Sequence, residues 1–65
     1  MTQENERLTQ ARLAKGLSQS EVAQAVGISQ PAYWDIEHGD RQPSLAVIKR
    51  LAKLFDCSID YLVGN

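Results

Sequence analysis

Sequence alone predicts two short helices on either side of Gly27, with only about two residues to join them. The first begins at Ser18, which has Glu21 three residues further on, the spacing of a capping box. The second begins at Ser29, a residue type that caps helix N-termini. Pro31 is tolerated in its first turn, where the backbone amides need no partner within the helix. Two helices joined by so short a turn are a candidate helix-turn-helix motif.

Three further helices are expected around this pair. A segment of good helix formers covers residues 4–15 and is ended by Gly16. Ser44 and Ser58 are expected to cap the remaining two, and the last of these ends at Gly64. Because no segment alternates between apolar and polar residues as a strand does, the expected fold class is all-α.

Apolar residues at helical spacing define the expected core. The same spacing places Lys49, Arg50 and Lys53 on the outer face of the fourth helix. The third helix, expected to stop at Gly39, has a polar face that points outward. The residues expected to face inward are Leu8, Ala11, Arg12, Val22, Ala23, Val26, Tyr33, Ile36, Leu45, Ile48, Leu51, Ala52, Phe55, Tyr61 and Leu62. The Tyr61 hydroxyl is expected to reach the surface.

Composition limits the classes of protein that are possible. A chain of 65 residues is one small domain, expected as a flexible N-terminus over 1–6 and a folded part over 7–64. Cys57 is the only cysteine, so no internal disulfide forms, and Cys57 with His38 does not make a zinc site. The polar N-terminus and the lack of a long apolar run favour a cytoplasmic protein without a membrane segment. Seven Lys and Arg against eight Asp and Glu give a net charge of −1, whereas nucleic-acid binders are usually basic.

The segments GLSQSEVAQAVGISQPAYWDIEHG and PSLAVIKRLAKLFDCSIDYLVG resemble the phage-repressor and Cro-like (XRE-type) helix-turn-helix family. The resemblance covers Arg7 to Gly64 and rests on LSQ-x-E-x-A, G-I-S-Q and I-E-x-G in this order. It implies a compact five-helix lambda-repressor-like DNA-binding domain with the helix-turn-helix at about 18–38. It also implies that the third helix lies in the DNA major groove while the second crosses the backbone.

The resemblance implies a role in DNA binding for residues of the second helix, the third helix and the loop after it. Gln30, Pro31 and Asp35 match positions from which the family contacts base edges, and Gln19 would touch a phosphate and brace Gln30. Helix N-termini offer backbone amides to phosphates, and a glutamine amide can pair with adenine, so the chemistry agrees. The expected DNA-binding residues are Gln19, Ser29, Gln30, Pro31, Ala32, Trp34, Asp35, His38, Arg41 and Gln42.

Trp34 and Asp35 depart from the family pattern, and several interpretations stay open. Trp34 could stack on a sugar, contact a thymine methyl group or fold over its own helix. Asp35 can accept a hydrogen bond from cytosine N4, yet it repels phosphates. His38 is either a helix cap or a DNA contact. The alternative function is a helix-turn-helix fold used chiefly as a protein-interaction module, antitoxin-like or cofactor-like, with the tryptophan as an interface anchor.

The function that the resemblance implies is sequence-specific DNA binding by a transcriptional regulator, a small repressor. It would act as a homodimer on a palindromic operator, with two recognition helices about 34 Å apart. Ile59, Leu62 and Val63 are the expected dimer residues, although they also close the core. Arg12 and Glu37 match a structural pair that ties the first helix to the end of the third. No nucleophile, base and orienting group stand at plausible spacing, so neither an enzyme nor a cofactor, metal or small-molecule substrate is expected.

Overall fold

The computed structural model describes residues 6–63, with Val63 described by its backbone alone. Within this range the chain forms five helices and no strand, which confirms the expected all-α architecture. None of these helices combines the length and hydropathy needed to span a lipid bilayer. The helices are α1 (Glu6–Ala14), α2 (Gln19–Val26), α3 (Gln30–Glu37), α4 (Leu45–Phe55) and α5 (Ile59–Val63).

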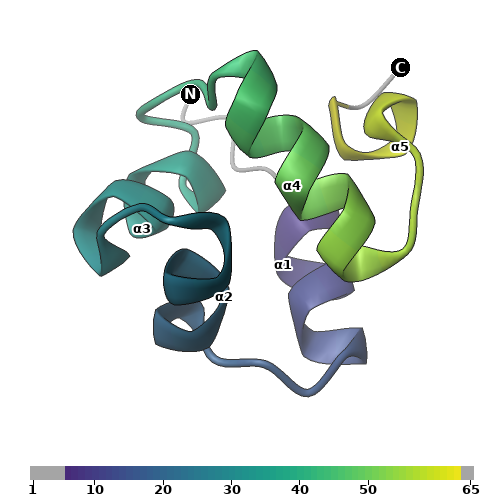
Figure 1. Cartoon of the computed structure of the whole chain (residues 1–65), viewed down its shortest axis with the longest axis horizontal. Helices are drawn as coiled ribbons and strands as arrows, with labels where there is room; N and C mark the ends of the chain where they lie inside the picture. Colours follow the sequence, from purple (N-terminus) through teal and green to yellow (C-terminus); the bar gives the residue numbers. More distant parts are fainter. Residues whose placement is uncertain (1–5, 64–65) are drawn as a thin grey trace.

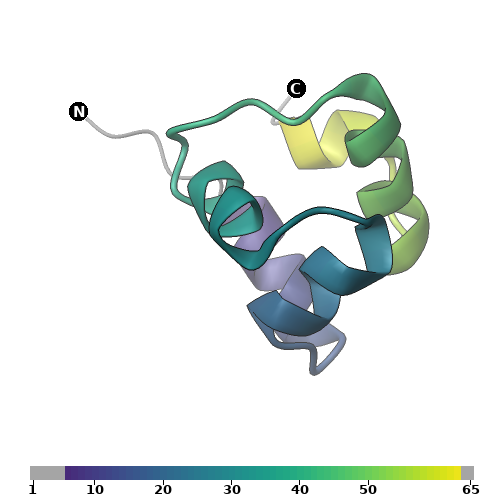
Figure 2. The same cartoon turned by 60° about the vertical axis from the view of Figure 1, so that its left-hand side comes forward.

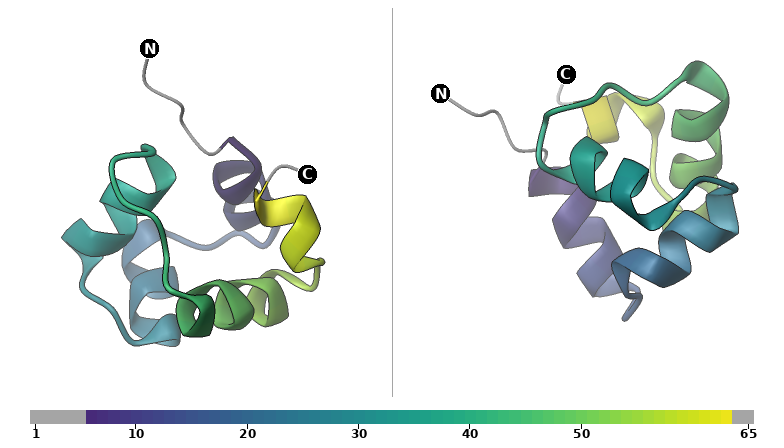
Figure 3. Two further views of the ribbon diagram at one scale, coloured as in Figure 1. Left: turned by 90° about the horizontal axis from the view of Figure 1, so that it is seen from above. Right: turned by 90° about the vertical axis from the view of Figure 1, so that its left-hand side faces the viewer.

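The order of packing places α3 and α5 at opposite sides of the molecule (Figure 1). α2 packs against α3 and α4, α4 packs against α5, and α1 packs against both α3 and α5. The loop between α3 and α4 crosses the top of the molecule in Figure 2. In the right-hand view of Figure 3, α3 lies in front of α1. One side of α3 therefore rests on the other helices, and the opposite side faces solvent.

Every helix contributes side chains to one core. α1 supplies Leu8 and α5 supplies Leu62, and both are completely buried. The other buried apolar residues come from α2, α3 and α4, as the helical spacing predicted. These residues are Val22, Ala23, Val26, Tyr33, Ile36, Ile48, Leu51, Ala52 and Phe55.

Leu45, an expected core residue, lies at the surface instead, and Tyr61, whose hydroxyl was expected to reach the surface, is exposed. Leu45 is 64% exposed, because it is the first residue of α4 and no other helix covers it there. Tyr61 is 41% exposed, and its ring lies 5.2 Å from the guanidinium carbon of Arg7. Arg7 also donates a hydrogen bond of 3.0 Å to the Tyr61 carbonyl oxygen, so α1 and α5 are joined by this arginine.

The serine caps form as predicted. Ser18, Ser29, Ser44 and Ser58 each accept a hydrogen bond from the amide three residues further on, over 3.0–3.2 Å. At Ser18 the capping box is complete, because Glu21 accepts from the Ser18 amide at 2.9 Å. The caps fix the start of each of these helices without help from distant residues.

Helix ends differ slightly from the sequence-based boundaries. α1 begins at Glu6, a residue expected in the flexible segment 1–6, and ends at Ala14, one residue before the expected Lys15. The rest of that segment, the expected start of the first helix and the expected stop at Gly64 lie outside the described residues. α3 ends at Glu37 with His38 as its cap, so Gly39 follows the helix by two residues.

The turn between α2 and α3 depends on Gly27 and on a contact from α4. Gly27 has φ +79°, a left-handed conformation that glycine adopts without steric cost, and the Ile28 amide donates to the Ala23 carbonyl at 3.0 Å. Arg50 donates to the Val26 carbonyl at 3.1 Å. Arg50 is exposed, as the sequence predicted, and it also satisfies a carbonyl at the end of α2.

Candidate functional site

Four residues on the outer side of α3 form a shallow depression of about 310 Å³. Gln30 and Pro31 lie in the first turn of the helix, and Trp34 and Asp35 lie one turn later. Gln30, Pro31 and Trp34 are exposed, and Asp35 is half-buried. The structure thus brings together on one face four residues that the sequence assigned to DNA binding.

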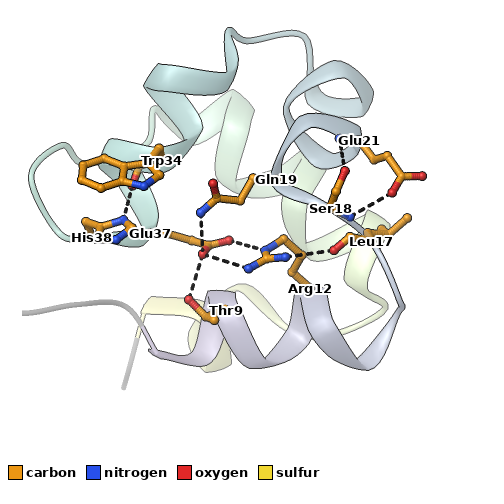
Figure 4. A network of polar contacts seen from close by, with 9 residues as sticks. All are labelled: Thr9, Arg12, Leu17, Ser18, Gln19, Glu21, Trp34, Glu37 and His38. Atoms are coloured by element: carbon orange, nitrogen blue, oxygen red, sulfur yellow. Dashed lines mark hydrogen bonds and ion pairs between the residues drawn. The ribbon is translucent and has the colours of Figure 1, made fainter.

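The indole of Trp34 is fixed by His38. The two rings stack with their centroids 3.6 Å apart and 18° between their planes (Figure 4). His38 Nδ1 lies 2.8 Å from the Trp34 carbonyl oxygen, and because a carbonyl oxygen only accepts, Nδ1 is the donor. Trp34 therefore packs on the end of its own helix, and His38 occupies the cap position, while a contact of the exposed part of Trp34 with a sugar or a methyl group stays a prediction.

Beneath α3, the carboxylate of Glu37 joins three helices (Figure 4). Glu37 is 4% exposed and accepts hydrogen bonds from Arg12 Nε at 2.7 Å and Thr9 Oγ1 at 2.9 Å. Gln19 of α2 donates to the same carboxylate at 3.3 Å. Arg12 also donates to the Leu17 carbonyl at 3.0 Å, so it holds the connection between α1 and α2.

This cluster confirms the geometry of the expected Arg12–Glu37 pair and adds a contact of Gln19. The Gln19 amide nitrogen donates to Glu37, a charged acceptor at the α2–α3 contact, while its expected contacts with a phosphate and Gln30 stay predictions. Thr9 was missed by the sequence interpretation. Its position one turn before Arg12 on α1 was the available signal.

The pKa values in the cluster follow from burial and hydrogen bonding. Burial opposes ionisation of Glu37, but hydrogen bonds, that from Arg12 foremost, hold the pKa of its carboxyl below the ordinary 4.5. The hydrogen bond to Glu37 raises the pKa of Arg12, although burial opposes this. Burial and the nearby Glu37 carboxylate raise the pKa of Tyr33 far above 10.0. The pair is therefore ionised at neutral pH, and it fixes α3 relative to α1 and α2.

A pH dependence of stability follows from the lowered pKa of Glu37. The pKa of the Glu37 carboxyl is lower in the folded chain than in the unfolded chain, where it is about 4.5. Ionised Glu37 therefore stabilises the fold above pH 4.5, and this stabilisation is lost as the pH falls through the folded-state pKa. We expect the unfolding free energy of the native chain to fall more steeply below pH 4.5 than that of Glu37→Gln. Urea unfolding between pH 3 and pH 7 measures both slopes.

Glu21→Gln serves as the control, because it removes a carboxylate whose pKa is lowered by the Ser18 amide but which is fully exposed. The unfolding free energy of this control is expected to fall below pH 4.5 almost as steeply as that of the native chain, since water screens exposed interactions. Equal slopes for native chain and Glu37→Gln would contradict the buried-pair interpretation.

The remaining expected site residues lie around the depression or beside it. Ser29 is exposed, but its hydroxyl caps α3, and Ala32 is half-buried on the same helix. Arg41 and Gln42 are exposed in the loop that follows α3. The loop and the start of α3 are therefore exposed and can contact a molecule that binds to α3.

The expected dimer residues require a correction. Leu62 has 0% exposure, because α5 uses it to close the core, so it offers no surface to a partner. Ile59 is half-buried and packs against the same core. The side chain of Val63 lies outside the described residues.

Five short helices, with the second and third joined by a tight turn and the third open to solvent, define a lambda-repressor-like helix-turn-helix domain. Residues 8–62 match the model of the helix-turn-helix family HTH_3, and the chain belongs to this family. The expected phage-repressor and Cro-like (XRE-type) family is confirmed.

Known relatives and solved structures agree with this assignment. The HTH-type transcriptional regulator AnsR of Bacillus subtilis (strain 168) is 41% identical over 60 residues, which are 92% of this chain and 52% of AnsR. The restriction-modification controller protein C.AhdI of Aeromonas hydrophila has a TM-score of 0.81 and 36% identity, covering 89% of this chain and 88% of C.AhdI. The P22 c2 repressor in complex with synthetic operator 9T has a TM-score of 0.85 and 31% identity, covering 94% of each chain. The chain spans about half the length of the first curated relatives it matches.

Proposed function

We propose that this chain is the sequence-specific DNA-binding domain of a transcriptional regulator, a small repressor, with α3 in the major groove. The observation that carries the proposal is the outward face of α3, where Gln30, Pro31, Trp34 and Asp35 lie together. The relatives named above support it, because one is a transcriptional regulator and one is a repressor in complex with an operator.

The chemistry of this face suits the edges of bases. A glutamine amide donates and accepts, so Gln30 can pair with adenine, and Asp35 can accept from the amino group of cytosine. The Glu37 cluster keeps α3 in a fixed orientation, which lowers the entropy lost when it enters a groove. Ser29 places the N-terminus of α3 beside the same face, where the positive end of the helix dipole suits a phosphate.

Few cations are free to contact phosphates near this face. Arg41 is exposed in the loop after α3. Arg7 is engaged at Tyr61 of α5, and Arg50 donates to the Val26 carbonyl. We therefore expect log affinity to fall with log salt by a slope of only about −2 for a dimer, because one arginine per chain neutralises one phosphate, at about −0.9 per phosphate.

Binding to one duplex between 50 mM and 300 mM salt measures this slope. A slope near −8 would contradict the proposed placement, because it would require Lys49, Lys53 or Arg50 of α4 to reach DNA as well.

We infer further that the chain acts as a homodimer on a palindromic operator. One α3 contacts too few bases to specify a site, and two related helices about 34 Å apart fit successive turns of the major groove. The α4–α5 end is the proposed dimer surface, and of the expected dimer residues Ile59 keeps partial exposure where Leu62 does not. The proposal predicts two chains per duplex in sedimentation and much weaker binding to a duplex with a single half-site.

Selection of bound duplexes from a random pool tests the function. The proposal predicts an enriched inverted repeat, called below the selected duplex. Asp35→Ala is expected to keep or increase affinity for scrambled DNA, because a charge that repels phosphates is gone. It should also lose about 1–3 kcal/mol of preference at one base pair in each half-site. If no sequence is enriched and no duplex binds, the protein-interaction alternative replaces this proposal.

A further inference from the structure

The depression on α3 combines two kinds of surface. Its apolar part consists of Trp34 and Pro31, and its polar part consists of Asp35 and Gln30, with Asp35 four residues after Pro31 and Trp34 four residues after Gln30. Its volume of about 310 Å³ is several times the roughly 30 Å³ of liquid that one water molecule occupies. The depression can therefore receive more than a single atom of a ligand.

The apolar part exists before any ligand binds. His38 stacks on the indole at 3.6 Å, and the ring is consequently held by its own helix. Trp34 is still 44% exposed, so the remaining part of its ring is available for contact. A preformed apolar surface receives an apolar group without the cost of ordering a side chain.

The carboxylate of Asp35 restricts which base edge can enter. An ionised carboxylate only accepts hydrogen bonds, so it favours an amino group such as N4 of cytosine or N6 of adenine. It disfavours the O4 atom of thymine and the O6 and N7 atoms of guanine, which are acceptors.

Cytosine and adenine differ in the ring atom that lies beside the amino group. In adenine the neighbouring group on the major-groove edge is N7, a polar acceptor that would face the apolar part of the depression. In cytosine the neighbouring ring atom is C5, which carries either hydrogen or a methyl group. A methyl group at C5 lies on the same edge as N4, so one base offers a donor to Asp35 and an apolar group to Trp34.

We propose that the depression formed by Gln30, Pro31, Trp34 and Asp35 recognises 5-methylcytosine in duplex DNA. Asp35 accepts a hydrogen bond from N4, and the surface of Trp34 and Pro31 receives the 5-methyl group. The inference rests on the proposed function, and it adds that binding responds to the methylation state of cytosine. Burial of one methyl group corresponds to about four-fold in affinity, and two half-sites together give about fifteen-fold.

The experiment begins with two random pools, one copied with cytosine and one with 5-methylcytosine. Each cytosine of the selected duplex is then replaced in turn by 5-methylcytosine or by thymine, and dissociation constants are measured. We expect one cytosine in each half-site at which methylation of both tightens binding about fifteen-fold. Replacement by thymine at that position is expected to weaken binding by at least five-fold, despite the added methyl group.

Two variants separate the two contacts. Trp34→Ala is expected to lose the gain from methylation but to keep the preference for cytosine over thymine. Asp35→Asn is expected to lose that preference but to keep the gain, because an amide accepts from N4 and donates to O4. Leu13→Ala is the apolar control, since Leu13 is exposed on α1, outside the proposed DNA and dimer surfaces, and it should change neither ratio.

Several results would overturn the inference. The inference is wrong if methylation of each cytosine in turn changes the affinity by less than two-fold. It is also wrong if Trp34→Ala still binds the methylated duplex more tightly. A strong preference for adenine at the base pair that Asp35 contacts, with no response to cytosine methylation at any other position, would also contradict it. Failure to bind any duplex is a different outcome, because it would refute the proposed function itself.

Discussion

Arg12→Met is expected to lower the free energy of unfolding by about 3 kcal/mol, because it leaves the buried carboxylate of Glu37 without its cation. Glu37 is 4% exposed, and Arg12 Nε lies 2.7 Å from its carboxylate oxygen. Thr9 and Gln19 would remain as neutral donors, which cannot balance the charge. For a domain of this size, such a loss is a large fraction of the total stability.

The double variant Arg12→Met with Glu37→Met supplies the control. An apolar pair needs no charge compensation, so the double variant is expected to recover a substantial part of the loss. Urea unfolding of the three chains at pH 7 measures this. A loss below about 0.5 kcal/mol in Arg12→Met would show that water screens the pair, contrary to its burial.

Gln30→Glu is expected to weaken binding to the selected duplex by about 100-fold or more while the fold remains intact. The change places one negative charge at the start of α3 in each chain, on the face proposed to lie against DNA. Charges of like sign held together at an interface cost several kcal/mol. For the helix itself the change is favourable, because an acidic residue in the first turn suits the helix dipole.

The matched control is Gln10→Glu, which makes the same change of charge at an exposed position of α1. It is expected to change affinity for the same duplex by only a few fold, since α1 lies outside the proposed interface. Fluorescence anisotropy gives both dissociation constants, and thermal unfolding checks the folds. Equal losses in the two variants would mean that net charge alone, not the position of α3, governs binding.

Local features of this fold could be predicted from the sequence. The serine caps, the left-handed Gly27 and the buried positions of α2 depend on residues within one or two turns of each other. The stacking of Trp34 on His38 is also local, because residues four apart on a helix are neighbours, so the sequence held enough information for it.

Contacts between distant segments could not be predicted in the same way. Thr9 and Gln19 reach Glu37 across 28 and 18 residues, and Arg50 reaches the Val26 carbonyl across 24. Periodicity states which side of a helix is apolar, but not which polar side chain of another helix arrives beside it. For that reason the contacts of Arg50 with Val26 and of Gln19 with Glu37 were not predicted.

The candidate site was predictable as a set of residues but not as a shape. Helical spacing places Gln30, Pro31, Trp34 and Asp35 on one face, and the family resemblance gives that face a role. The depression between them depends on the side-chain conformation of Trp34. Leu45 shows that helical spacing alone does not prove burial. Its spacing is that of a core residue, but no other helix covers it.

The most direct test of the placement of α3 is a titration of the ¹⁵N-labelled chain with the selected duplex, followed by NMR. If α3 enters the major groove, the largest changes will affect the amides of residues 29, 30 and 32–35, the indole N–H of Trp34 and the amides at the start of α2. Amides on the core side of α4 should change little. Large changes confined to α4 and α5, with the resonances of α3 unmoved, would contradict the proposal that α3 is the DNA-binding helix.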